Sequence, residues 1–118
     1  MNMQKLTPEQ IELGLTNADV SIRKEFAECR DYTLTPAQIE RGLTDESPEV
    51  RARFADRKDY RPTPEQIERG LTDPEISIRY TFAEREDYTP TPAQMERGMK
   101  DPHRFVRMLF AQRMDGMH

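Results

Sequence analysis

Apolar and polar positions recur along this chain with a period of 28 residues. The string TPEQIERGLTD begins at Thr63, and close variants of it begin at Thr7, Thr35 and Thr91. The chain therefore divides into a leader, 1–6, and a single repeat domain, 7–118. Its blocks are 7–34, 35–62, 63–90 and 91–118. Self-similarity at such a period is typical of solenoids, in which each repeat buries its apolar face against its neighbours.

The first half of each block predicts a short helix. It opens with Thr-Pro-x-Gln, in which Thr is a good N-cap, Pro suits the first helical position and Gln completes a capping box. Apolar residues four apart then share one helical face. These pairs are Ile11/Leu15, Ile39/Leu43, Ile67/Leu71 and Met95/Met99. A glycine precedes the second member of each pair, which predicts close approach of the adjacent helix backbone, because glycine otherwise destabilises a helix.

The second half of each block predicts another helix. The expected N-caps are Asn17, Asp45, Asp73 and Asp101, with Pro74 and Pro102 at the first helical position. The apolar residues follow an i, i+4, i+5 spacing, which is helical, whereas a strand needs alternation. The stripes are Ile22/Phe26/Ala27, Val50/Phe54/Ala55, Ile78/Phe82/Ala83 and Val106/Phe110/Ala111. The predicted fold class is therefore all-α, an α-solenoid of four 28-residue two-helix repeats.

The first and last blocks depart from the shared pattern. Leu13 stands in a column that otherwise holds arginine, and we expect the leader, with Met1, Met3 and Leu6, to cover it. The tyrosine that closes the first three blocks is replaced by glycine in the last. We interpret this tyrosine as packing against the next repeat, since terminal repeats are expected to differ.

The motif Asp-x4-Val-Arg, at 45–51 and 101–107, resembles the turn and second helix of HEAT repeats. With the Phe-Ala that follows and the next Thr-Pro, the blocks also resemble the leucine-rich repeat variant family of short bacterial helical repeats. The resemblance covers all four blocks and implies a right-handed superhelix that binds by its surface rather than by catalysis. Such arrays occur in bacteria and their phages. The chain departs from the family in its longer Asp-Tyr segment and in lacking a cysteine cluster, so no iron–sulfur centre is implied.

In HEAT-like repeats the turn Asp and the helix Arg form a ladder between neighbouring repeats. The resemblance implies this role for Asp45, Asp73, Asp101, Arg23, Arg51, Arg79 and Arg107. The alternative is a stripe of arginines that binds nucleic-acid phosphates. Acidic residues accompany the arginines almost one for one, whereas a phosphate-binding face carries one sign of charge. We therefore prefer the ladder.

Composition and charge limit which partners and which cellular compartment we expect for this chain. The chain has 118 residues, 34% of them charged, and a net charge of −4, which provides no general attraction to nucleic acid or anionic membranes. No apolar run is long enough to span a bilayer, and the first residues lack a signal-peptide apolar region. Cys29 is the only cysteine, so no intrachain disulfide can form. We expect a cytoplasmic protein.

The sequence contains no pattern that predicts catalysis, a cofactor or a metal site. His103 and His118 are the only histidines, and a metal site needs several convergent ligands. Cys29 is expected near a helix C-terminus, which disfavours a thiolate. The recurring glutamates, Glu12, Glu40, Glu68 and Glu96, are interpreted as a solvated helix face.

Surface positions of the second helix differ between blocks, which is expected of a partner-specific face and equally of relaxed surface drift. The candidate partner-binding residues are Arg53, Tyr80, Arg104, Phe105, Met108 and Leu109. Block 91–118 also carries Met114 and Met117, and its five basic and three acidic residues give it a net charge of +2. Its extra apolar residues either seal the open end of the array or form a docking or dimerisation patch.

The predicted function is a non-enzymatic protein-binding module that acts as a small inhibitor or adaptor. A phage-encoded antagonist of a host nuclease or defence complex is one example. We also consider a second copy of the chain as a partner, in a homodimer formed through the last repeat. The alternative from another class is a nucleic-acid-binding HEAT-like protein that uses the arginine stripe.

Overall fold

A computed structural model describes residues 6–116 of the chain. This range contains eight α-helices and no strand, which confirms the all-α prediction. The helices are α1 (Pro8–Leu15), α2 (Val20–Glu28), α3 (Pro36–Leu43), α4 (Pro48–Ala55), α5 (Pro64–Leu71), α6 (Ile76–Glu84), α7 (Pro92–Gly98) and α8 (Arg104–Gly116). They form two compact units, with the division between Tyr60 and Arg61. We call the first unit 1 and the second unit 2.

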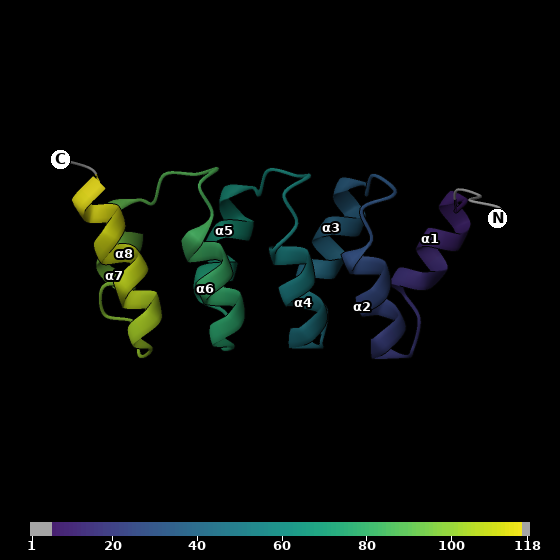
Figure 1. Cartoon of the computed structure of the whole chain (residues 1–118), viewed down its shortest axis with the longest axis horizontal. Helices are drawn as coiled ribbons and strands as arrows, with labels where there is room; N and C mark the ends of the chain where they lie inside the picture. The colour runs from purple at the N-terminus through teal and green to yellow at the C-terminus, as the bar shows by residue number, and fades with distance from the viewer. Residues whose placement is uncertain (1–5, 117–118) are drawn as a thin grey trace. The chain divides into compact units, whose positions relative to one another are not determined.

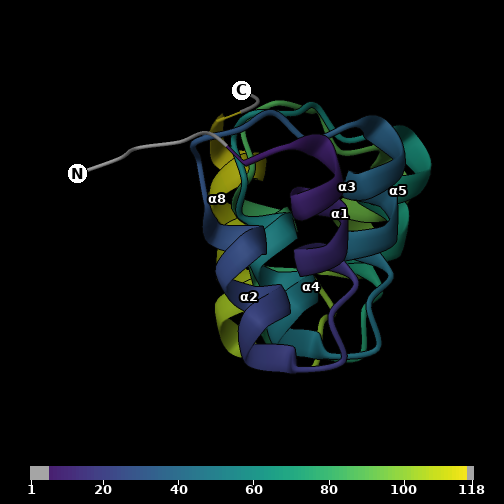
Figure 2. The same cartoon turned by 90° about the vertical axis from the view of Figure 1, so that its right-hand side faces the viewer.

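Each unit consists of two helical hairpins stacked in two layers. In unit 1, α1 packs on α2 and α3 packs on α4, while α1 lies beside α3 and α2 lies beside α4 (Figures 1 and 2). Unit 2 has the same arrangement, with α5 and α7 in one layer and α6 and α8 in the other. One hairpin is one sequence repeat, so each unit contains a complete junction between neighbouring repeats.

The first helix of every repeat begins as its sequence predicts. Thr7, Thr35, Thr63 and Thr91 each form a complete capping box with the glutamine three residues later, and Pro occupies the first turn. The paired apolar residues of α1, α3 and α5 are buried, as expected. The prediction was wrong at Met99, which is 37% exposed. It is the C-cap residue of α7, and no described helix covers it.

The second helices begin two residues later than predicted. Asp45, for example, is not the N-cap of α4; its Oδ1 accepts a hydrogen bond from the backbone N–H of Ser47, and α4 starts at Pro48. Asn17, Asp73 and Asp101 make the equivalent bond in their own turns. An Asx turn of this kind uses the same side-chain oxygen that a cap would use. The sequence pattern therefore identified the turn and misplaced the start of the helix.

Phenylalanine rings from the second helices fill the centre of each hairpin. Phe54 and Phe82 are almost fully buried, together with Val50, Ile78 and their neighbouring alanines. A Cβ on Gly42 or Gly70 would overlap these rings. The recurring glycine therefore makes room for a side chain of the same repeat, which corrects the expectation that it contacts the backbone of an adjacent helix.

The tyrosine that follows each of α2, α4 and α6 caps the helix before it. The hydroxyl groups of Tyr60 and Tyr88 donate to the carbonyl oxygens of Phe54 and Phe82, at 3.1 and 2.9 Å, and Tyr32 does the same for Phe26. Burial raises the pKa of Tyr32 to about 12. This hydrogen bond lies within one repeat. The sequence predicted that the tyrosine packs on the next repeat, and it did not predict this capping role.

The two ends of the chain differ from the inner repeats. Helix α8 continues to Gly116, whereas α4 ends at Ala55 and α6 at Glu84. Leu13 is 69% exposed. The expectation that the leader covers Leu13 depends on Met1 and Met3, which lie outside the described residues, as do Met117 and His118. No helix among residues 6–116 has the length and apolar character needed to cross a bilayer.

Candidate functional site

The predicted ladder residues form ion pairs at the repeat junction inside each unit. In unit 1, Arg23 Nε and Nη2 donate to the carboxylate of Asp45 at 3.0 and 3.1 Å. In unit 2, Arg79 makes the same bidentate pair with Asp101, at 2.9 and 3.2 Å. Each of these arginines also donates through Nη1 to carbonyl oxygens of its own turn. Their guanidinium groups are therefore already occupied by acceptors of this chain.

The other ladder residues contact the turn of their own repeat. Arg51 Nη1 donates to the carbonyl oxygens of Asp45 and Glu46, and Arg107 Nη1 donates to that of Asp101. Asp73 is buried and accepts a bond from the backbone of Glu75. All seven residues thus take part in the turns or junctions of the repeats.

A second set of arginines was missed in the sequence. Arg57 is completely buried, and its Nη1 reaches the carbonyl oxygens of Ala27 and Cys29 in the preceding repeat, at 2.7 and 2.8 Å. Its Nε and Nη2 pair with Asp59, and the pKa of that carboxyl is lowered mainly by this hydrogen bonding. The available signal was the recurrence of Arg-x-Asp after the second helix. In the first repeat, Cys29 occupies the position that holds arginine in the other three repeats.

Two of the recurring glutamates also form ion pairs at repeat junctions, a role that the interpretation as a solvated face did not include. In unit 1, Glu12 accepts hydrogen bonds from Gln38 and pairs with Arg41 at 2.8 Å. In unit 2, Glu68 is bound in the same way by Gln94 and Arg97. These bonds lower the pKa values of both glutamates, with the arginine bond as the largest cause. Leu13 occupies the column of Arg41 and Arg97, whose side chains pair with a glutamate of the preceding repeat.

The surface of the second helices differs between the two units. In unit 1, two ion pairs cross from α2 to α4: Lys24 with Glu49 at 2.8 Å, and Arg53 with Glu28 at 2.5 Å. Arg53, a predicted partner-binding residue, is thus paired within its own unit. This face of unit 1 is therefore charged and carries two ion pairs, while Glu25 is exposed and makes no ion pair with any residue of 6–116.

The same columns in unit 2 hold mostly apolar side chains, with Ser77 and Thr81 as their polar members. Tyr80 on α6 occupies the column of Lys24, and Met108 on α8 is the next member of that column. Phe105, Met108 and Tyr80 are 43%, 49% and 36% exposed, and Leu109 is half-buried. The Arg104 guanidinium lies over the Phe105 ring, 5.2 Å from its centre. We call Tyr80, Arg104, Phe105, Met108 and Leu109 the helix-two face of unit 2.

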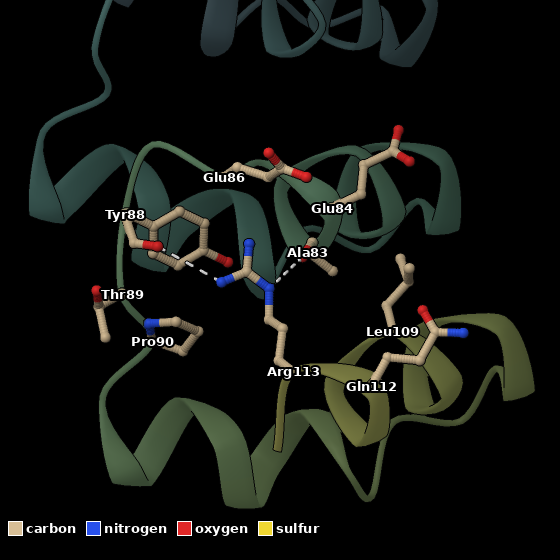
Figure 3. Close-up of a pocket in the computed structure, with 9 residues that line it drawn as sticks. All are labelled: Ala83, Glu84, Glu86, Tyr88, Thr89, Pro90, Leu109, Gln112 and Arg113. Carbon is tan, nitrogen blue, oxygen red and sulfur yellow. Dashed lines mark hydrogen bonds between the residues drawn. The ribbon is translucent and has the colours of Figure 1, made fainter. Parts of the chain in front are cut away.

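A groove of about 710 Å³ adjoins this face, between the end of α6 and helix α8 (Figure 3). Leu109, Pro90 and the Tyr88 ring provide apolar walls. Arg113 projects into the centre of the group, toward Ala83 and Tyr88 (Figure 3). Glu84 and Glu86 stand at the opposite border and make no ion pair with any residue of 6–116.

A second, more apolar groove of about 480 Å³ lies on the other side of the last repeat. It is lined by the prolines that precede and begin α7 and by Met95, Met99 and Met114. Met99 and Met114 are each about two-fifths exposed, at 37% and 41%. The described residues of the last repeat therefore cover Met99 and Met114 only in part.

Among the candidate chemical groups, Cys29 belongs to unit 1 and His103 to unit 2. Cys29 is the half-buried C-cap residue of α2, and the backbone N–H of Phe105 donates to His103 Nδ1 at the start of α8. Among residues 6–116, no group of three or more His, Cys, Asp or Glu side chains is arranged to hold a metal ion. His118, the other histidine, lies outside the described residues.

Comparison with known families identifies a match within the first unit. A model described as a HEAT repeat associated with sister chromatid cohesion matches residues 37–52, from α3 into α4. The match includes the turn residue Asp45 and the ladder residue Arg51 and supports a HEAT-like helical repeat. The resemblance to leucine-rich repeat variants stays a prediction. Searches for similar curated proteins and solved structures found no match.

Proposed function

We propose that this protein is a non-enzymatic protein-binding module whose partner docks on the helix-two face of unit 2. The observation that carries the proposal is the contrast between the units. Unit 1 stacks its repeats with charged residues and two ion pairs on this face, so the fold does not require apolar residues there. Unit 2 nevertheless exposes Tyr80, Phe105 and Met108 at the corresponding columns. Exposed aromatic and methionine side chains beside a groove are characteristic of protein interfaces.

We further propose that the four repeats form one right-handed α-solenoid. The support is in the sequence: Arg51 and Asp73 have the same separation as the paired residues Arg23 and Asp45 in unit 1 and Arg79 and Asp101 in unit 2. Glu40, Gln66 and Arg69 likewise repeat the spacing of Glu12, Gln38 and Arg41. A rigid array of this kind suits an inhibitor or an adaptor in the cytoplasm.

The electrostatics of the ladder favour a protein partner over a nucleic acid. The guanidinium groups of Arg23 and Arg79 are bound to carboxylates, whose charge opposes an approaching phosphate. The chain is acidic as a whole, with a net charge of −4. A stripe of free arginines, which the alternative function needs, is therefore not supported at these two positions.

Affinity capture from the source cell tests the proposal. The wild-type chain is compared with Phe105→Ser/Met108→Ser, and the control is Leu13→Ser, which removes a more exposed apolar residue from unit 1. We expect a specific protein to be retained by the wild type and the control, with nuclease present, and lost from the double variant. Adding the protein to the captured partner's assay then separates an inhibitor from an adaptor.

Two results would contradict this function. Equal capture by all three chains would show that the exposed residues of α8 are not the docking surface. Capture that disappears on nuclease treatment would favour the nucleic-acid alternative. Light scattering identifies the homodimer as a rival occupant, since a dimer that Phe105→Ser/Met108→Ser dissociates would mean that the face binds a second copy.

A further inference from the structure

We infer that Arg113 is the anchor of the groove between α6 and α8, where it binds a carboxylate of the partner protein. This inference rests on the proposed function and specifies the chemistry of the docked segment: one acidic group flanked by apolar residues. Three arginines occupy the same column of the repeat: Arg57, Arg85 and Arg113.

The two earlier members of the column each have a carboxylate from this chain. Arg57 donates to Asp59 through Nε and Nη2, at 3.0 and 2.6 Å. Arg85 makes the same bidentate pair with Asp87, at 3.1 and 2.7 Å. Both arginines are at most 1% exposed. In each case the aspartate lies two residues after the arginine, in the loop that follows the second helix.

Arg113 has no such partner among residues 6–116. Its Nε donates to Ala83 O at 3.0 Å and its Nη1 to Tyr88 O at 3.4 Å, while its guanidinium carbon lies 4.8 Å from the centre of the Tyr88 ring. It makes no ion pair with any residue of 6–116, and its Nη2 makes no hydrogen bond within that range. The guanidinium is half-buried and lines the groove (Figure 3).

The cause of this difference is the length of α8. Asp115 is the equivalent of Asp59, but it lies within α8, which runs to Gly116. Residues two apart on a helix do not face each other, and Asp115 is exposed instead of pairing. The loop that would carry a carboxylate back to Arg113 is thus replaced by helix. An external carboxylate would complete the arrangement that Asp59 and Asp87 complete in the earlier repeats.

The remaining lining of the groove limits which acidic segment fits. Leu109, Pro90 and Tyr88 offer apolar contact close to the guanidinium. Glu84 and Glu86 would repel a run of acidic residues, because like charges at short range are unfavourable. The favoured ligand therefore has a single Asp, Glu or terminal carboxylate between apolar side chains.

A peptide-display selection on the full-length chain tests this inference. The probe is a library of random twelve-residue peptides, and enriched peptides are measured by fluorescence anisotropy against wild type, Arg113→Gln and Arg107→Gln. Arg107 is the matched control, because it is an exposed arginine of α8 whose side chain, within residues 6–116, bonds only to the turn carbonyl of Asp101. Losing a hydrogen bond to a charged group is expected to weaken binding by about ten- to hundred-fold.

We expect enriched peptides to contain an acidic group beside apolar residues. Their binding should weaken about ten-fold or more in Arg113→Gln, remain unchanged in Arg107→Gln, and decline as pH falls through the carboxylate pKa near 4. Gln112→Glu provides a second variant that leaves Arg113 in place. It adds a carboxylate to the lining of the groove and should also weaken these peptides. Circular dichroism melting of each variant checks that the fold is intact.

Other results would overturn the inference in distinguishable ways. Peptides that need Phe105 and Met108 but bind Arg113→Gln normally would leave the proposed docking face valid and remove Arg113 as its anchor. Enrichment of basic peptides that depend on Glu84 and Glu86 would assign the groove the opposite ligand. Failure of any peptide to bind the wild type would contradict both the anchor and the docking face.

Discussion

Arginine side chains connect one repeat to the one before it, and Arg57 illustrates how a charge is accommodated at such a junction. Its guanidinium is completely buried, yet Nη1 binds two carbonyl oxygens and the other nitrogens bind Asp59. A buried cation is tolerated only when it is paired and hydrogen-bonded in this way. The planar fork of arginine suits the arrangement better than lysine would.

Replacing Arg57 with Met should destabilise the protein by about 2–4 kcal/mol, because two buried carbonyl oxygens lose their donor. Arg53→Met is the control, since its ion pair with Glu28 is half-exposed and is expected to contribute less than about 1 kcal/mol. Urea unfolding monitored by circular dichroism measures both. Similar losses in the two variants would mean that the buried network contributes no more than a surface pair.

The aspartate beside Arg57 should make stability depend on acid pH. The pKa of Asp59 is lowered in the folded protein, chiefly by its hydrogen bonds with Arg57. Its contribution is therefore present above the ordinary aspartate pKa of about 4 and is lost as pH falls through the lower, folded value. We expect Asp59→Asn to reduce the fall in urea midpoint between pH 6 and pH 3. Asp56→Asn, at an exposed carboxylate without an ion pair in the described range, should not.

Gly42 shows a conflict between helix propensity and packing. Alanine there would favour the helix by up to about 1 kcal/mol, but its Cβ would overlap the Phe54 ring. We expect Gly42→Ala to destabilise the protein by about 1–3 kcal/mol, as overpacking does. Adding Phe54→Leu should recover part of that loss in a double-mutant cycle. A stabilised Gly42→Ala protein would show that the ring can move aside.

At the scale of the elements, short helices depend on their ends. Helices α1, α3 and α5 have only eight residues each, and isolated helices of that length are marginal in water. Each carries a complete capping box, and each second helix follows an Asx turn. These local bonds satisfy backbone groups that the short helices leave without an internal partner.

Removing one N-cap should therefore have a measurable effect. Thr35→Ala deletes the hydroxyl that accepts from Gln38 N at 3.1 Å and should lower stability by about 1 kcal/mol. Thr33→Ala, at an exposed threonine just before the helix, makes no such contact and serves as the control. Thermal melts by circular dichroism distinguish the two. An equal shift in both variants would assign the effect to the loop rather than to the cap.

At the scale of the whole molecule, the proposed solenoid predicts one cooperative unfolding transition. Its sharpest test compares Arg51→Ala with Arg79→Ala, because both arginines bond to carbonyl oxygens of their own turn. Arg79 also pairs with Asp101 inside unit 2. If the four repeats are continuous, the two variants should lose similar stability in urea and the chain should unfold in a single step. Two transitions, with little effect from Arg51→Ala, would indicate independently folding units.

The sequence by itself determined the 28-residue period, the helical class, the capping boxes and most of the buried stripes, because these depend on local spacing and backbone chemistry. It also identified Arg23 and Asp45 as ladder residues, through a family resemblance. The tertiary structure decided which residues of different helices contact each other, because spacing along the chain does not determine these contacts. It showed that Glu12 binds the next repeat, that Arg57 is buried, and that Gly42 faces a phenylalanine ring. These features depend on residues about 12 to 30 positions away, whose proximity arises only when the hairpins form and stack. The isolated guanidinium of Arg113 is likewise a tertiary result, because its missing carboxylate follows from the continuation of α8 as a helix.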